Sequence, residues 1–263
     1  MLLYYLGDIM KIEKIRKLKS GKYKLEIDND KIITYDDVIL NNNLLFNKEV
    51  DEELFNKLNI ETRYYDVYNR VIKYITTKMR SNLEIEKYLT KLNVDETDQK
   101  KIIHDLTELG LINDNNYVKA FISDKIHLSN NGRLKIKKEL LEHNIDENII
   151  DLELSKYENK IFIDKIQKII EKKIKTNKNS IFILKGKLYQ ELVNLGYEKE
   201  LIIPYLDNIN INDNKNIEKE ATSIYNKLIK KYSEEETLQK LKSKLYQKGF
   251  QMDDINEIIK RIA

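Results

Sequence analysis

The chain has 263 residues, of which 41% are hydrophobic and 35% charged, and its formal net charge is +3. Seven glycines and one proline are too few for a sheet-rich or loop-rich fold, so most of the chain should be helical. The absence of cysteine excludes disulfides, thiolate nucleophiles and zinc–thiolate sites, and it favours a reducing, cytoplasmic location.

The first segment, "MLLYYLGDI", is too short for a signal peptide and lacks the basic start that such peptides have. Met10 follows it directly, so we treat residues 1–9 as an extension that the fold does not use. No apolar run approaches the ~18 residues of a membrane helix, and we expect no membrane partner.

Residues 11–35 have the pattern of short strands. In "KYKLEID", Tyr23, Leu25 and Ile27 alternate with charged residues, which is the period of a half-buried strand. Turn-forming residues flank this segment at Ser20-Gly21 and at 28–30. We therefore expect a small three-stranded meander.

A short helix is expected after the meander. Val50, Leu54 and Leu58 fall on one face of this helix, which we expect to end near Asn59. From Tyr64 onward the hydrophobic pattern is helical throughout.

Four stretches of the helical part share one pattern. They are "IEKYLTKLNV" (85–94), "IKKELLEHNI" (136–145), "LYQELVNLGY" (188–197) and "LKSKLYQKGF" (241–250). Each has an aliphatic residue, leucine four later, asparagine or glycine four after that, and then an apolar residue. The pattern predicts a helix that ends in the left-handed conformation and is covered by the apolar residue that follows. The residues expected in that conformation are Asn93, Asn144, Gly196 and Gly249.

The copies are 51, 52 and 53 residues apart, which is typical of tandem supersecondary units. Each unit has room for three helices. We expect a mainly α fold, an elongated curved array of three-helix repeats preceded by a small β-meander domain. The expected boundaries are 1–60 for the β domain and 61–111, 112–158, 159–208 and 209–263 for the four repeats.

The polar cluster from Asn113 to Asn116 has two interpretations, a cation loop or a joint between helices. The cluster lacks the central glycine of an EF-hand loop, and so does the second Asn/Asp-rich run at 207–216. We therefore interpret both as joints between repeats, with Asp114 as an N-cap and Tyr117 on the apolar face of the helix that follows. Ser81 with Glu84, and Ser233 with Glu236, have the spacing of capping boxes.

Motifs that would indicate an enzyme are absent. The three histidines lack the i, i+4 spacing of a helical metal pair, the Gly-Lys of "LKGKLY" has no preceding glycine loop, and no Gly-x-Ser-x-Gly occurs. We expect no catalytic residue, no metal and no cofactor.

One charge feature remains. Residues 164–187 hold eight lysines against one Asp and one Glu, whereas 95–120 hold six acids against three lysines. The basic stretch could follow a phosphate backbone, or it could be an ordinary lysine-rich solvent face. The sequence leaves both interpretations open.

The first two repeats resemble the RecX family, regulators of the RecA recombinase. The resemblance rests on "YITTKMRSNLEIEKYL", "LTELGLINDNNYVKAFI" and "NNGRLKIKKELLEHNI". The family has a basic-x-Arg-Ser box, here Lys78, Arg80 and Ser81, and later a glycine followed by Ile-x-x-Glu-Leu, here starting at Gly132. This chain departs from the family pattern at Lys78, Asn113, Val118 and Asn144, which stand where Arg, Asp, Ala and Gly are usual.

The resemblance implies a monomeric, non-enzymatic regulator that lies in the groove of the RecA–single-stranded DNA filament. Such regulators suppress the ATPase, strand-exchange and coprotease activities of RecA and promote filament disassembly. The candidate contacts to RecA or DNA are Lys78, Arg80, Arg133, Lys137, Lys138, Lys172, Lys173, Lys175 and Lys178. The expected structural residues are Ser81, Glu84, Asp114, Tyr117 and Gly132. Two alternatives remain open: a helical-repeat protein that binds nucleic acid without RecA, and a pure protein-interaction scaffold.

Overall fold

The computed structural model describes residues 9–210 and 213–262, and these contain four strands and thirteen helices. The expectation for residues 1–9 concerns a segment that, apart from Ile9, lies outside the described residues, as do 211 and 212 of the joint at 207–216. The chain separates into two compact units, which meet in sequence between Tyr117 and Val118.

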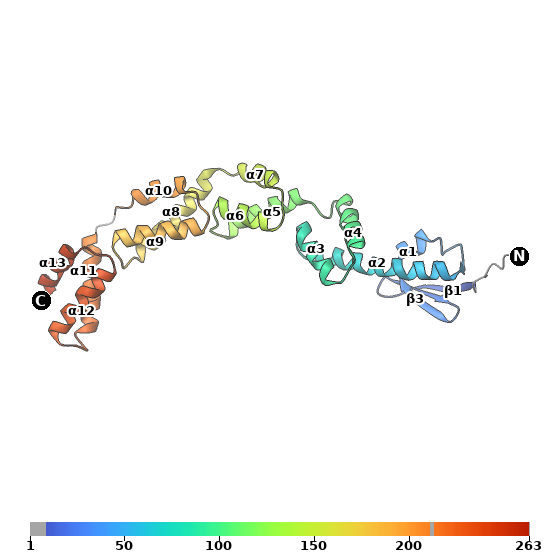
Figure 1. Ribbon diagram of the computed structural model, residues 1–263, viewed down its shortest axis with the longest axis horizontal. Helices are drawn as coiled ribbons and strands as arrows, with labels where there is room; N and C mark the ends of the chain where they lie inside the picture. The colour runs from blue at the N-terminus through green and yellow to red at the C-terminus, as the bar shows by residue number, and fades with distance from the viewer. Residues whose placement is uncertain (1–8, 211–212, 263) are drawn as a thin grey trace. The chain divides into compact units, whose positions relative to one another are not determined.

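The first unit begins with an antiparallel sheet in the order β3-β2-β1-β4 (Figure 1). The elements of this part are β1 (Met10–Lys17), β2 (Tyr23–Ile27), β3 (Asp30–Thr34), α1 (Asp36–Asn41), β4 (Glu49–Val50) and α2 (Glu52–Thr77). The meander from β1 to β3 forms as predicted, with Leu25 and Ile27 fully buried. The sequence analysis missed both α1 and β4.

The prediction of a short helix ending near Asn59 is wrong. Asp51 caps α2 by accepting the N–H of Leu54 at 2.7 Å, so Val50 lies before the helix and pairs with Met10 in the sheet. The helix then runs through Asn59 without a break to Thr77. Apolar residues of α2 such as Leu58 pack against the sheet, and so does one polar residue, Thr62, whose hydroxyl is 2.6 Å from that of Thr34.

The second half of α2 joins α3 (Asn82–Lys91) and α4 (Glu96–Glu108) as repeat 1. One core cluster holds buried side chains from all three helices and from the joint after α4: Val71, Ile85, Leu89, Ile102, Leu106 and Ile112. A separate cluster lies between the sheet and the start of α2 and includes Leu58. The long helix α2 therefore contributes to two cores.

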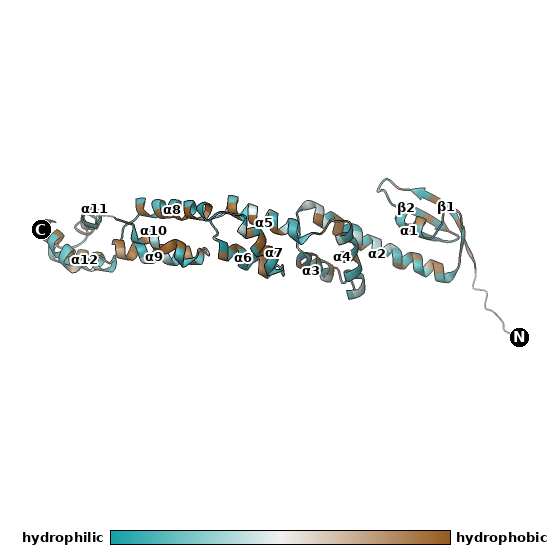
Figure 2. Cartoon of the chain, turned by 90° about the horizontal axis from the view of Figure 1, so that it is seen from above, coloured by the Kyte–Doolittle hydropathy of each residue, from teal (hydrophilic) through white to brown (hydrophobic). Residues whose placement is uncertain are grey.

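Nine helices follow in groups of three. Repeat 2 is α5 (Asp114–Leu128), α6 (Arg133–Glu142) and α7 (Glu147–Ser155). Repeat 3 is α8 (Asn159–Lys175), α9 (Ile181–Asn194) and α10 (Lys199–Asp207), and repeat 4 is α11 (Asp213–Leu228), α12 (Glu234–Gln247) and α13 (Met252–Ile262). The helices are amphipathic, and Figure 2 shows hydrophobic and hydrophilic stretches alternating along α8 and α9.

The repeated stretch forms the middle helix of each repeat and ends as predicted. Asn93, Asn144, Gly196 and Gly249 have φ values of 56°, 58°, 80° and 82°. In each case the N–H of the next residue donates to the carbonyl five residues back, as from Tyr197 to Leu192 at 3.1 Å. This is the Schellman closure, which satisfies carbonyl groups that a helix end leaves free.

Middle helices of the second unit also contact one another through their ends. The N–H of Gly132, before α6, donates to the carbonyl of Leu195 at 2.7 Å, and Leu134 donates to Gly196 at 3.0 Å. The N–H of Ser180, before α9, donates in the same way to the carbonyl of Lys248 at 2.9 Å. The start of one middle helix therefore docks on the Schellman turn of the next, and this contact joins repeats 2, 3 and 4.

Candidate functional site

The two basic residues of the basic-x-Arg-Ser box, which precedes α3, differ in their surroundings: Arg80 contacts other side chains of the fold, whereas Lys78 is exposed. The Arg80 guanidinium pairs with Glu84 at 3.0 Å and lies 4.2 Å from the Tyr74 ring centroid, and Tyr74 itself stacks on Tyr88. Ser81 and Glu84 form the predicted capping box, with bonds of 3.3 and 3.1 Å. Lys78 is exposed. Of the two basic residues, only Lys78 is available to a partner.

Asp114 is not the N-cap that the sequence suggested. The side chain of Asn113 accepts the N–H of Asn116 at 3.0 Å and so caps α5, which makes Asp114 the first residue of the helix. Asp114 instead accepts a bond from the Asn82 amide at 3.3 Å, at the start of α3. The neighbouring Tyr117 is buried as predicted, and burial raises its pKa to about 12.

The contact between Asn82 and Asp114 leaves one oxygen of each side chain without a hydrogen bond. The other carboxylate oxygen of Asp114 and the amide oxygen of Asn82 are both buried and have no hydrogen-bond partner among the described residues. Burial raises the pKa of Asp114, and the bond from Asn82 offsets this only in part. Buried acceptor atoms without a hydrogen-bond donor cost stability.

We expect Asp114→Asn to stabilise the protein at neutral pH. The new amide can donate to Asn82 while still accepting from it. The carboxyl of Asp114 takes up its proton at a higher pH in the folded chain than in the unfolded chain, where the pKa is about 3.9. The wild type should therefore gain stability as the pH falls through the folded-state pKa toward that value, and the variant should lack this gain. Urea unfolding at pH 4 to 7 measures the stability difference between the two proteins and its pH dependence. If Asp114→Asn is less stable than the wild type at pH 7, the unpaired oxygens do not destabilise the fold.

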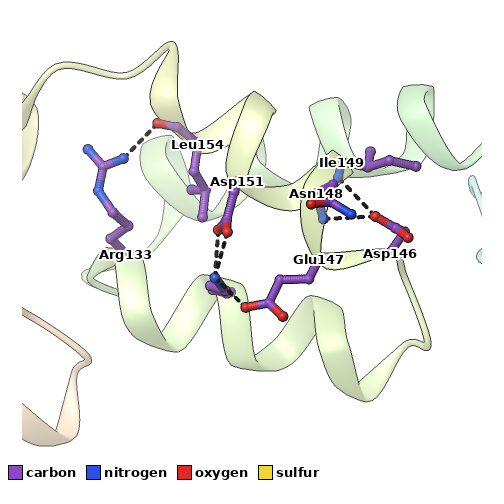
Figure 3. A network of polar contacts seen from close by, with 8 residues as sticks. Arg133, Asp146, Glu147, Asn148, Ile149, Asp151 and Leu154 are labelled. Carbon is purple, nitrogen blue, oxygen red and sulfur yellow. Dashed lines mark hydrogen bonds and ion pairs between the residues drawn. The ribbon is translucent and has the colours of Figure 1, made fainter.

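In repeat 2, Arg133 connects the start of α6 to the end of α7. Its guanidinium donates to the carbonyl of Leu154 at 2.8 Å (Figure 3). It also donates to the carbonyl of Tyr157 at 2.9 Å and lies 5.0 Å from the Phe162 ring centroid. These carbonyls lie at the end of α7, where a helix leaves carbonyls unpaired and favours a cation. The sequence could not assign this role to Arg133, because its partners lie 21 or more residues away.

Of the two lysines on α6, one is paired and the other is exposed. Lys137 lies between Glu147 and Asp151, each at 2.7 Å, and these partners raise its pKa (Figure 3). Lys138 is exposed and lies 4.0 Å from Glu142. Only Lys138 of this pair remains a candidate contact residue.

At the end of α8 and in the loop after it, the candidate lysines Lys172, Lys173, Lys175 and Lys178 are all exposed. Lys173 pairs with Glu191 of α9 at 2.6 Å. Lys175 lines one hollow, and Lys178, in the loop after α8, lines this hollow and the one next to it.

The two hollows adjoin where repeats 3 and 4 meet. The first, of about 360 Å³, is lined by Lys175, Lys178, Lys215 and Lys219 together with Glu220. The second, of about 350 Å³, is lined by Lys173, Lys178, Lys187 and Lys248 together with Glu191. They share Thr176, Asn177 and Lys178. We call the pair the lysine hollows.

Four of these lysines were not among the contact residues predicted from the sequence: Lys187, Lys215, Lys219 and Lys248. Lys187 lies inside the basic stretch at 164–187. Lys215 and Lys219 come from α11, where acidic residues are close in sequence and hide the local excess of lysine, whereas Lys248 directly follows α12, in a lysine-containing stretch that was not singled out. Only the folded chain brings them to the end of α8.

Among residues 9–210 and 213–262, no group of acidic or histidine side chains could hold a metal ion. No helix in the same part of the chain is long and apolar enough to span a membrane.

Comparisons with known proteins agree on one family. Residues 113–154 match the model of the second three-helix domain of RecX, and residues 214–259 match that of the third. A protein of Lactococcus lactis subsp. lactis named regulatory protein RecX is 31% identical, over 97% of this chain and 98% of its own length. The protein of the same name from Streptococcus agalactiae serotype III is 32% identical, over 95% and 99%.

Two solved structures are also similar. The crystal structure of RecX from Lactobacillus salivarius matches with a TM-score of 0.51 and 29% identity, over 56% of this chain and 97% of that one. A crystal structure of regulatory protein RecX matches with a TM-score of 0.66, over 73% of this chain and 96% of that one. At 22% identity, this second likeness concerns the fold.

Proposed function

The chain belongs to the RecX family, the regulators of the RecA recombinase, and we propose that it binds the groove of the RecA–single-stranded DNA filament and inhibits RecA. Bound there, it suppresses the ATPase, strand-exchange and coprotease activities. It acts as a monomer in the cytoplasm and needs no cofactor.

The observation that carries this proposal is the match to regulatory proteins over nearly the whole chain, repeats and sheet included. The family consists of regulators rather than enzymes. Tandem repeats provide many contact points along one chain, which suits a regulator that bridges neighbouring subunits of a filament.

The contacts of the candidate residues narrow the choice of binding residues. Arg80, Arg133 and Lys137 use their charges inside the fold, and Lys173 is paired with Glu191. The residues that we propose as contacts to the filament are Lys78, Lys138, Lys172, Lys175 and Lys178, which are all exposed.

A second candidate function is direct binding of nucleic acid without RecA. The lysine hollows favour it, because they gather seven lysines and two glutamates in one place. The two functions are compatible, since a filament regulator can hold the DNA as well as the protein.

We expect substoichiometric amounts of the protein to lower the DNA-dependent ATPase of the RecA from the same host. A titration into RecA on single-stranded DNA measures this, with the protein alone as the control for hydrolysis of its own. If RecA turnover stays constant while the protein still shifts DNA in a gel, direct nucleic-acid binding replaces filament regulation as the function.

A further inference from the structure

The lysine hollows carry an excess of positive charge that the fold does not neutralise. Their two acidic residues are both already paired: Glu191 with Lys173 at 2.6 Å, and Glu220 with Lys248 at 3.3 Å. The five remaining lysines form no ion pair within the described ranges; they are Lys175, Lys178, Lys187, Lys215 and Lys219. All five are exposed.

This arrangement differs from an ordinary lysine-rich helix face. The five lysines come from the end of α8, the loop after it, α9 and α11, and they surround two concave surfaces that adjoin. Like charges that converge on a concave surface raise the local potential and attract anions there. The same convergence costs stability through repulsion, and a bound polyanion would remove that cost.

We infer that the lysine hollows bind the phosphate backbone of single-stranded DNA, with successive phosphates in the two hollows and Lys178 between them. This inference rests on the proposed function, because the RecA filament supplies DNA in that form. The backbone of a single strand is flexible, so successive phosphates can turn toward lysines of both hollows, whereas the phosphates of a duplex are held in fixed positions along the helix. Lysines contact phosphates as point charges, so the binding should not depend on sequence.

The position of the hollows gives the binding a second consequence. Lys175 and Lys178 belong to repeat 3, whereas Lys215 and Lys219 belong to repeat 4. A strand held by both groups would bridge the two repeats. DNA binding should therefore raise the melting temperature of the protein.

The test measures binding of a fluorescent oligothymidine to the full-length protein, without RecA, by anisotropy at several salt concentrations. The test variant carries Lys175→Gln, Lys178→Gln, Lys215→Gln and Lys219→Gln. The matched control carries Lys160→Gln, Lys199→Gln, Lys227→Gln and Lys231→Gln. The control lysines are also exposed and without an ion pair in the described part of the chain, so both variants lose the same charge.

The test variant should bind at least about tenfold more weakly at 0.1 M salt. Its slope of log affinity against log salt should be shallower by about 0.7 for each lost phosphate contact. The control should bind like the wild type. Both variants should melt no lower than the wild type without DNA, because the replaced lysines are exposed and the test set repel one another.

Three results would overturn the inference. One is unchanged binding by the test variant, and another is equal weakening by the control, which would mean that only the net charge matters. The third is displacement of the oligomer by inorganic phosphate or duplex DNA as readily as by unlabelled single strands. The ATPase titration with wild-type protein tests the proposed function separately. If the lysine hollows do not bind DNA, ATPase suppression would still support regulation of the filament. If the protein does not suppress the RecA ATPase, the anisotropy measurement would still show whether the hollows bind DNA.

Discussion

Gly132→Ala should destabilise the second unit by about 3 kcal/mol, in the upper part of the range for an overpacked contact. A Cβ built on Gly132 would lie 2.4 Å from the backbone oxygen of Gly196, and backbone atoms cannot turn aside as the end of a long side chain can. The change would push α6 away from the turn after α9. It would thereby stretch the bonds from Gly132 to Leu195 and from Leu134 to Gly196.

The cause is steric rather than conformational. Gly132 has a φ of −81°, which any residue adopts, so alanine brings no backbone strain of its own. Gly186, inside α9, is the matched control, because a Cβ there meets nothing within 4 Å. Gly186→Ala should stabilise the protein by about 0.5–1 kcal/mol, the difference between the two residues inside a helix.

Urea unfolding followed by circular dichroism measures both changes, which should have opposite signs. If Gly132→Ala unfolds at the urea concentration of the wild type while Gly186→Ala is stabilised, the docking of α6 on the turn after α9 contributes little in solution. The function offers a second readout, because a regulator that spans several filament subunits needs its repeats held together. Gly132→Ala should then also weaken the suppression of RecA.

Local patterns made the helical part of this fold predictable. The asparagine or glycine that closes each middle helix, and the capping box at Ser81, depend on residues within one or two helical turns. The sheet was harder to predict, because β4 is two residues long and Val50 also fits the i, i+4 pattern of the helix that follows. The contact that holds Thr62 of α2 against Thr34 of the sheet cannot be seen in the sequence either.

The candidate site was less predictable, because the role of a charged residue depends on partners that are distant in the chain. The sequence shows that Arg133 and Lys138 are basic, but only the fold shows that the first is held by α7 and the second is exposed. Lys215 lies 37 residues after Lys178, and no periodicity predicts that both line one hollow. Sequence reasoning therefore found the basic region at the end of α8 and missed the half of the site that repeat 4 contributes.

The basic-x-Arg-Ser box allows structural and binding roles to be separated within three residues. We expect Arg80→Ala to destabilise the first unit by about 2–3 kcal/mol, since it removes a charged hydrogen bond to Glu84 and a cation over Tyr74. The side chains of Arg80 and Glu84 are each 20% exposed, so water replaces these contacts only in part. Lys78→Ala should change stability by less than about 0.5 kcal/mol, because Lys78 is exposed.

The pH dependence of the Arg80 variant provides an independent check. Burial raises the pKa of Glu84, but the Ser81 N–H and the Arg80 guanidinium outweigh burial, and the pKa lies below its ordinary value. Glu84 therefore stabilises the fold above its unfolded pKa of about 4.3, and this contribution is lost as the pH falls through the folded-state pKa. Arg80→Ala should reduce that loss between neutral and acid pH, whereas Lys78→Ala should keep most of it.

The ATPase assay then separates the two roles. Lys78→Ala should fold normally and suppress RecA less, whereas Arg80→Ala should suppress RecA in proportion to the fraction that remains folded. A stable Arg80→Ala protein that has lost suppression would show that this arginine contacts the filament directly. In that case the Arg80 guanidinium would have to leave Glu84 and Tyr74 on binding, and the main role of Arg80 would be to contact the filament and not to stabilise the fold.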